Sequence, residues 1–257
     1  MQDPIVVIGV GEMAGVFTRG LLKLGYPIFP VTRQMEMDKI AKALAPPKMV
    51  LIAVGENDLH AVLEQIPASW RNRLALLQNE LLPRDWQAHA IDNPTVIAVW
   101  FEKKKGQDYR VLLPSPAYGP NAALLEQALE TLEIPAWELS DETELTYELV
   151  RKNVYILTTN IAGLELPAGT DVDALWNQHQ PLAREVAGEV MDIQFKLIGQ
   201  ELDRERLIEG MLEGIDGDLR HQCMGRSAPG RLARAIAHAN EFALAVPKLR
   251  AIHASQG

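Results

Sequence analysis

The segment from Ile5 to Ala14 constrains the fold of this chain more than any other. It joins the apolar run Ile5–Ile8 to a glycine-rich turn that reads Gly9-Val10-Gly11-Glu12-Met13-Ala14. In a strand-to-helix turn of this kind, the first glycine permits an unusual backbone conformation and the second leaves no Cβ in the way of a ligand. The small residue Ala14 lets the helix pack closely on the strand. Because a helix N-terminus also carries N–H donors and a partial positive charge, the turn is suited to a pyrophosphate.

A G-x-G-x-x-A match alone does not exclude an ordinary strand-to-helix turn. The residues after the turn help to distinguish the two interpretations. Apolar side chains recur at helical spacing as far as Leu24, and Gly25 then ends the helix. A second strand is predicted over residues 28–31. The first part of the chain therefore has the strand-helix-strand pattern of a dinucleotide-binding unit.

The end of the second predicted strand indicates which dinucleotide is bound. Sites for NAD commonly place Asp or Glu there to hold the ribose hydroxyls, whereas a 2′-phosphate needs a cation and small hydrogen-bonding groups. This chain has Thr32 and Arg33 and no acid at that point. Arg33 alone fits a solvated surface residue equally well, but a guanidinium at this distance from Gly9 is placed for a phosphate. The pattern favours NADP over NAD.

Two domains are predicted. Residues 1–139 alternate short β-rich runs with helices, which is typical of a mostly parallel sheet covered on both faces, a Rossmann-type α/β domain. Residues 140–257 have an almost entirely helical pattern. We expect a cleft between the domains where substrate meets cofactor. The predicted strands are Ile5–Ile8, Ile28–Val31, Met49–Val54, Leu74–Leu77, Thr95–Phe101 and Tyr109–Leu113, and the predicted helices of the first domain are Glu12–Leu24, Asp38–Leu44, Leu59–Gln65 and Asn121–Leu132.

Composition excludes several classes of function. The net charge of −9 argues against general nucleic-acid binding, and no apolar stretch is long enough to predict a membrane span. The six histidines form no ligand-spaced pair, so no metal site is expected. The single cysteine, Cys223, fits a reducing cytoplasm and is interpreted as a spare buried thiol. The basic run Lys103–Lys105 is interpreted as a solvated turn between two strands, and Pro114, Pro116 and Pro120 are expected to break the segment after the last strand.

Two polar groups are candidates for the chemistry. Lys152 lies in the first predicted helix of the second domain, with Asn160 eight residues later and about 80° round the helix. A lysine there could stabilise the oxygen of a carbonyl undergoing reduction and then protonate it. The alternative is that Lys152 reaches solvent and Asn160 ties helices together. Asn79 follows the fourth predicted strand, where ligands of parallel sheets bind, although it fits a turn amide capping the helix near Leu82 equally well.

With these features the chain resembles the ketopantoate reductases, members of the 6-phosphogluconate dehydrogenase-like superfamily, over nearly its whole length. The shared features are the glycine turn, Arg33, Gln78-Asn79, the Lys152 helix and Ala245-Val246-Pro247. The resemblance implies reduction of a 2-keto acid by NADPH. It implies that Lys152 is the acid/base and that Asn160 and Asn79 orient substrate and cofactor. The cofactor residues that follow from the turn, the strand ends and the resemblance are Gly9, Val10, Gly11, Glu12, Met13, Thr32, Arg33, Val54, Gly55 and Asn79.

The chain departs from the family pattern at several positions. Ile156 stands in place of the first helix asparagine, and Glu80 replaces the glycine after Asn79. The family's lysine after the third strand is absent, and the segment 226–230 lacks the glutamate that binds the pantoate hydroxyls. Loss of a buried hydrogen-bonding partner costs about 1–3 kcal/mol, so a related keto acid or imine is expected in place of ketopantoate.

Two functions from different classes remain open. The preferred one is an NADP-dependent reductase acting on a small 2-keto acid or related carbonyl or imine substrate. The alternative is a non-catalytic NADP-binding sensor or scaffold that keeps the fold. The expected partner is a small-molecule substrate, without nucleic acid or membrane, and a homodimer is left open.

Overall fold

The chain divides into two compact units, residues 1–149 and 150–257, each of which is described by itself. The computed structural model describes residues 2–256. Helix α6 (Glu142–Gly163) begins in the first unit and ends in the second. The sequence-based boundary, between residues 139 and 140, lies just before this helix.

The first unit contains a seven-stranded sheet with the strand order β2-β1-β3-β4-β5-β8-β9. Neighbouring strands are parallel except for β5 and β8, which are antiparallel. The predicted mostly parallel sheet is therefore confirmed. The fully apolar strand β1 lies between β2 and β3 and is buried, as expected for a parallel sheet covered on both faces. The strands are β1 (Ile5–Ile8), β2 (Ile28–Val31), β3 (Met49–Ile52), β4 (Leu74–Leu76), β5 (Thr95–Ile97), β8 (Ser115–Tyr118) and β9 (Ala136–Glu138).

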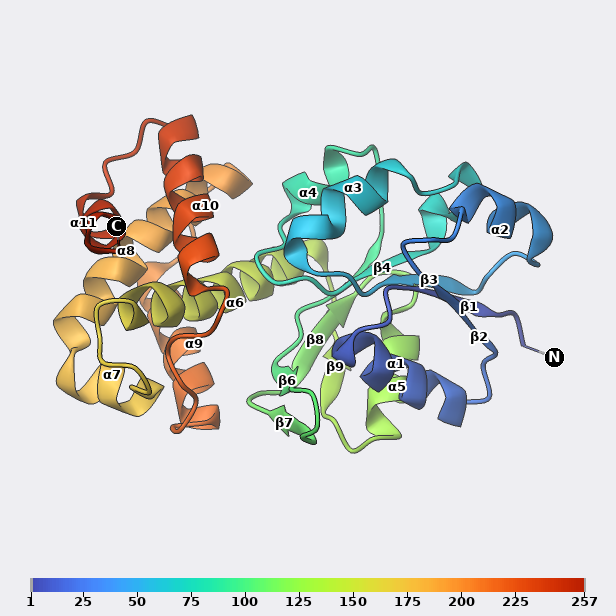
Figure 1. Cartoon of the computed structure of the whole chain (residues 1–257), viewed down its shortest axis with the longest axis horizontal. Helices are drawn as coiled ribbons and strands as arrows, with labels where there is room; N and C mark the ends of the chain where they lie inside the picture. Colours follow the sequence, from blue (N-terminus) through green and yellow to red (C-terminus); the bar gives the residue numbers. More distant parts are fainter. Residues whose placement is uncertain (1, 257) are drawn as a thin grey trace. The chain divides into compact units, whose positions relative to one another are not determined.

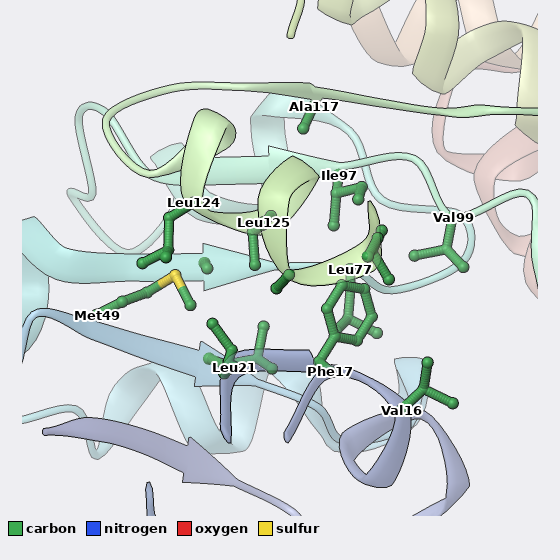
Figure 2. Packing of buried hydrophobic residues seen from close by; sticks show 14 of the residues in the cluster. Val16, Phe17, Leu21, Met49, Leu77, Ile97, Val99, Ala117, Leu124 and Leu125 are labelled. Carbon is green, nitrogen blue, oxygen red and sulfur yellow. The ribbon is translucent and has the colours of Figure 1, made fainter. Parts of the chain in front are cut away.

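Helices cover both faces of this sheet, with α1 and α5 on one face and α2, α3 and α4 on the other (Figure 1). Phe17 and Leu21 of α1 and Leu125 of α5 belong to the buried cluster between helices and strands (Figure 2). A Cβ on Gly20 would lie 2.2 Å from the carbonyl oxygen of Ala128, so only glycine allows α1 to approach α5 this closely. The helices are α1 (Glu12–Lys23), α2 (Met37–Ala43), α3 (Leu59–Glu64), α4 (Pro83–Gln87) and α5 (Ala122–Glu130), with short 3₁₀ turns at Glu56–Asp58 and Ala68–Arg73.

The structure corrects the sequence-based strands after residue 95. The single predicted strand Thr95–Phe101 is two strands, β5 and β6 (Phe101–Lys103), because the chain leaves the sheet after Ile97. Strand β6 pairs only with β7 (Tyr109–Val111), in a separate antiparallel hairpin. Tyr109–Leu113 therefore does not belong to the main sheet.

Strands β8 and β9 were not predicted, because prolines obscure the first of them. Pro116 was expected to break the chain but lies inside β8. Its carbonyl oxygen accepts a hydrogen bond from the N–H of Ala98 at 2.9 Å. Its missing N–H costs little, because β5, the neighbour on that side, ends at Ile97.

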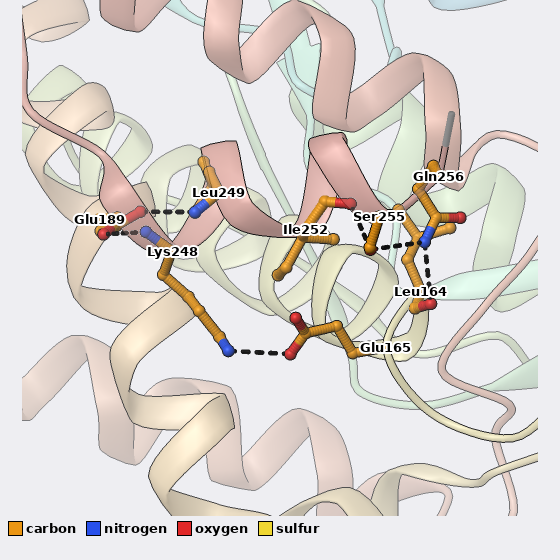
Figure 3. Close-up of polar contacts among 8 residues, drawn as sticks. All are labelled: Leu164, Glu165, Glu189, Lys248, Leu249, Ile252, Ser255 and Gln256. Carbon is orange, nitrogen blue, oxygen red and sulfur yellow. Dashed lines mark hydrogen bonds and ion pairs between the residues drawn. The ribbon is translucent and has the colours of Figure 1, made fainter.

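The second unit is helical, as predicted. The amide of Asn153 on α6 donates to Gln194 on α8 at 2.9 Å, and both side chains are buried. Both carboxylate oxygens of Glu189 accept from backbone N–H groups at the start of α11, where Lys248 also pairs with Glu165 (Figure 3). An acid at a helix N-terminus satisfies N–H groups that have no partner within the helix. The helices are the C-terminal part of α6, α7 (Val172–Gln178), α8 (Gln180–Ile198), α9 (Arg204–Gly217), α10 (Ala228–Glu241) and α11 (Pro247–Ser255).

Candidate functional site

The glycine turn between β1 and α1 has the backbone geometry that its sequence predicts. Gly9 adopts a positive φ of 95°, and a Cβ there would lie 2.6 Å from the carbonyl oxygen of Ala53, at the end of β3. Gly11 is the N-cap of α1, and among the described residues no atom beyond its own chain neighbours lies within 4 Å of the position that its Cβ would take. Within residues 2–256, no side chain caps this helix end by a hydrogen bond. The first N–H groups of α1 therefore lie beside open space, which suits an anion.

Two pockets open at the carboxyl ends of the parallel strands, on either side of this turn. We call them pocket A, of about 800 Å³, and pocket B, of about 340 Å³. Residues of the glycine turn and of the segment after β3 line both, so the two pockets are neighbours along the sheet edge. The shared residues are Gly11, Ala53, Val54 and Gly55.

All ten residues predicted to bind the cofactor line one pocket or both. Pocket A is lined by Gly9, Val10, Gly11, Thr32, Arg33, Val54 and Gly55. Pocket B is lined by Gly11, Glu12, Met13, Val54, Gly55 and Asn79. Two pockets that share the glycine turn suit a ligand with two halves whose centre lies at that turn. A dinucleotide has this form, with a pyrophosphate at its centre.

Arg33 extends from the end of β2 into the lining of pocket A. Its guanidinium forms an ion pair with Asp58, at 3.0 Å between Nη2 and Oδ2. The Arg33 side chain is 90 % exposed, so this pair contributes little to stability and leaves the guanidinium available to a ligand. Asp58 was not predicted as part of the site, because only the fold brings it beside Arg33.

Gln78 and Asn79, which follow β4, lie in different environments. Gln78 is buried, and its amide donates to the carbonyl oxygen of Ile52 at 2.6 Å, which ties the ends of β3 and β4 together. Asn79 lines pocket B. The next residue, Glu80, has a φ of 62°, a left-handed conformation in which glycine is more usual.

The predicted capping role near Leu82 is performed by another residue. The N–H of Leu82, the N-cap of α4, donates to the Asp85 carboxylate at 2.7 Å. The alternative interpretation of Asn79 as the cap of this helix therefore has no support.

Lys152 and Asn160 are both buried on α6 in the second unit. The alternative in which Lys152 reaches solvent is wrong in this structure, since only 6 % of the residue is exposed. Asn160 accepts a hydrogen bond from the Arg231 guanidinium on α10, at 2.7 Å between Oδ1 and Nη1. This contact matches the alternative in which Asn160 ties helices together.

Arg231 was missed by the sequence analysis, which searched residues 226–230 for an acid. It lies in the first turns of α10, just after that segment, and is 7 % exposed. Buried arginines are uncommon unless they are paired. The only indication in the sequence is its position next to residues 226–230, where the family pattern has an acid and this chain does not.

Neither a candidate metal site nor a candidate membrane-spanning helix occurs among the described residues. Between residues 2 and 256, no cluster of three or more His, Cys, Asp or Glu side chains is arranged to hold a metal ion. None of the helices described has the length and apolar character needed to cross a membrane. Burial raises the pKa of the Cys223 thiol to about 12, which fits its interpretation as a buried thiol.

Comparison with known proteins identifies the fold. No family model and no curated protein matches the sequence. Solved structures match over almost the whole chain. The 2-dehydropantoate 2-reductase from Methylococcus capsulatus has a TM-score of 0.66 at 14 % identity, covering 98 % of this chain and 95 % of its own.

Two further structures show the same similarity. The dimeric ketopantoate reductase from Staphylococcus aureus has a TM-score of 0.63 at 13 % identity, with 98 % of both chains covered. D-mandelate dehydrogenase in complex with NADH has a TM-score of 0.63 at 12 % identity, covering 97 % of this chain and 96 % of its own. These matches confirm the predicted resemblance at the level of fold. The chain therefore has the fold of the ketopantoate reductases, which D-mandelate dehydrogenase shares.

Proposed function

We propose that this protein is an NADP-dependent oxidoreductase that reduces a small 2-keto acid, or a related carbonyl or imine, in the manner of a ketopantoate reductase. One observation carries the proposal. The residues predicted from the sequence to bind the dinucleotide line two neighbouring pockets around an uncapped helix N-terminus. Open space at the Gly11 Cβ position leaves room for phosphates against the backbone.

Each part of the sheet edge has a role in this proposal. The N–H groups at the start of α1 hold the pyrophosphate, and Arg33 with Thr32 holds the 2′-phosphate in pocket A. Asn79 orients the nicotinamide end in pocket B. When bound, NADPH supplies the hydride.

Lys152 is the proposed proton donor to the substrate oxygen or nitrogen. Its burial supports this role, because a positive charge removed from water interacts more strongly with a developing negative charge. Asn160 orients the substrate. The guanidinium of Arg231, held by Asn160, adds a second buried cation suited to a carboxylate. Ketopantoate itself is disfavoured, because the acid expected to bind its hydroxyl groups is absent from residues 226–230.

A substrate panel tests the proposal. Purified protein with NADPH is incubated with 2-keto acids of graded side-chain size, with their amide or aldehyde counterparts, and with cyclic imines. NADPH oxidation is followed at 340 nm. We expect turnover with at least one compound, faster for the acid than for its uncharged counterpart. NADPH binding without oxidation by any compound would contradict the enzymatic function.

That outcome would support the second candidate, a non-catalytic NADP-binding sensor or scaffold. Two departures from the family pattern favour this alternative, namely Ile156 in place of the first helix asparagine and the absence of an acid from residues 226–230. Since the Staphylococcus aureus reductase is dimeric, we also propose a homodimer, which light scattering on the purified chain would test. A cytoplasmic location stays a prediction.

A further inference from the structure

The lining of pocket B, which includes the proposed phosphate position at the start of α1, has more acidic than basic side chains. Three carboxylates line it, those of Glu12, Glu56 and Glu102, of which Glu102 is paired with Lys104 at 3.0 Å. Of the described residues that line it, Lys103 alone is a cation. Among these acids, Glu12 should repel a bound phosphate most strongly, because it lies in the first turn of α1, where the phosphate would also bind.

Lys103 lies against this acid. Its Nζ is 3.2 Å from Oε2 of Glu12, and its side chain is only 18 % exposed. The same Nζ donates to the carbonyl oxygens of Lys104 and Gln107 in the hairpin turn. The predicted turn between two strands is confirmed, and Lys104 and Lys105 in it are exposed, but Lys103 ends β6 and is not solvated as predicted.

The hairpin β6–β7 is packed so that Lys103 has a defined position. Phe101 of β6 lies against Phe17 of α1, with the ring centroids 6.0 Å apart. Side chains two residues apart lie on the same face of a strand, so Lys103 shares the face of Phe101 toward α1. On β7, the Tyr109 ring lies under the Arg19 guanidinium, at 5.5 Å, and its hydroxyl donates to the carbonyl oxygen of Leu132.

We propose that Lys103 is a cofactor-positioning residue that neutralises Glu12 and so admits the phosphates of the dinucleotide to the N-terminus of α1. This inference rests on the proposed function and assigns a role in it to the β6–β7 hairpin. Without the ammonium, the Glu12 carboxylate would compete with the pyrophosphate for the same N–H groups and partial positive charge. With it, the pair is neutral and the helix end is available to the ligand.

The test compares four proteins: wild type, Lys103→Met, Lys105→Met and the double variant Lys103→Met/Glu12→Gln. Lys105→Met is the matched control, because it removes the same charge from an exposed position in the same turn. The dissociation constants of NADPH and NADH are measured by fluorescence titration, and thermal unfolding is recorded for every protein. We expect Lys103→Met to bind both dinucleotides about tenfold more weakly, which equals about 1.4 kcal/mol. The control should match wild type, and the double variant should recover to within about threefold.

Each result decides the inference. Unchanged affinity in Lys103→Met overturns it. A loss that the double variant does not recover also overturns it, because a purely structural role of Lys103 would not be relieved by removing the Glu12 charge. If wild type and Lys105→Met bind neither dinucleotide, the proposed function itself fails, and this inference fails with it.

Discussion

Replacing Gly9 by alanine should destabilise the first unit, whereas replacing Gly11 by alanine should largely preserve the stability of the unit and weaken its binding of a dinucleotide. At Gly9, the new Cβ would lie 2.6 Å from the carbonyl oxygen of Ala53, about 0.8 Å short of ordinary van der Waals contact at 3.4 Å. The oxygen belongs to the backbone at the end of β3, so the strands must separate. The positive φ adds about 1–2 kcal/mol of strain for alanine, and overpacking adds about 1–3 kcal/mol.

The expected loss of stability in Gly9→Ala is therefore roughly 2–5 kcal/mol. For a chain of this size, each kcal/mol lowers the melting temperature by about 2–4 °C, so a decrease of roughly 4–20 °C is expected. Tryptophan fluorescence reports mainly on the first unit, because only Trp176 lies outside it. The tryptophans inside it are Trp70, Trp86, Trp100 and Trp137.

Gly11→Ala places its Cβ in open space and keeps a φ of −77°, so it should cost at most about 1 kcal/mol. The methyl group would lie between the backbone and a phosphate. Because a hydrogen bond to a charged group contributes about 1.5–3 kcal/mol, NADPH should bind roughly 10- to 100-fold more weakly. A stable Gly11→Ala protein with wild-type affinity would refute the placement of the phosphates. An unchanged melting temperature in Gly9→Ala would refute the packing argument.

Three further predictions concern single side chains. Arg33→Ala should weaken NADPH roughly 10- to 100-fold and NADH less than about twofold, and equal losses in titrations of both would exclude a 2′-phosphate contact. Lys152→Met should lower turnover by at least about 100-fold with unchanged NADPH affinity, and a loss within tenfold would exclude proton donation. Cys223 should be silent to Ellman's reagent at pH 8 until the protein unfolds, because burial raises its pKa to about 12. The folded protein thus favours the neutral thiol more than the unfolded chain does, whose Cys223 pKa is about 9.0. This contribution to the free energy of unfolding should be fully present below pH 9 and lost as the pH rises from 9 towards 12, which melting temperatures measured across this range would show.

The cofactor end of the site could be predicted because the residues that form it are close together in the sequence. The strand Ile5–Ile8, the glycines after it and Arg33 lie within one strand-helix-strand unit, whose geometry follows from backbone conformation and apolar spacing. A parallel sheet then brings the ends of β1, β2 and β3 to the same edge without further information. The residues Val54 and Gly55 follow from that rule alone.

The charged partners could not be predicted, because they depend on contacts between distant segments. Asp58 meets Arg33 from 25 residues away, and Lys103 reaches Glu12 only because the hairpin packs on α1. The run of three lysines before Gly106 has the composition of a turn, and only the alternation of a strand directs the first of them inward. Pro116 was wrongly predicted to break the chain. It lies within β8, where a proline is tolerated because the neighbouring strand β5 has ended.

In the second unit, the sequence indicated Lys152 and Asn160 but not what surrounds them. Helical spacing placed the two residues on one helix, and both are buried. The partner of Asn160 comes from α10, 71 residues later in the chain. Sequence spacing carries no information on which residues of two separate helices meet.

Titration of the wild-type protein with NADPH and with NADH tests the central claim most directly, because every proposed role depends on a dinucleotide at the edge of the sheet. Isothermal calorimetry should show one site per chain, with NADPH bound at least about tenfold more tightly than NADH. Absence of heat and of fluorescence change with both dinucleotides at millimolar concentration would contradict the account.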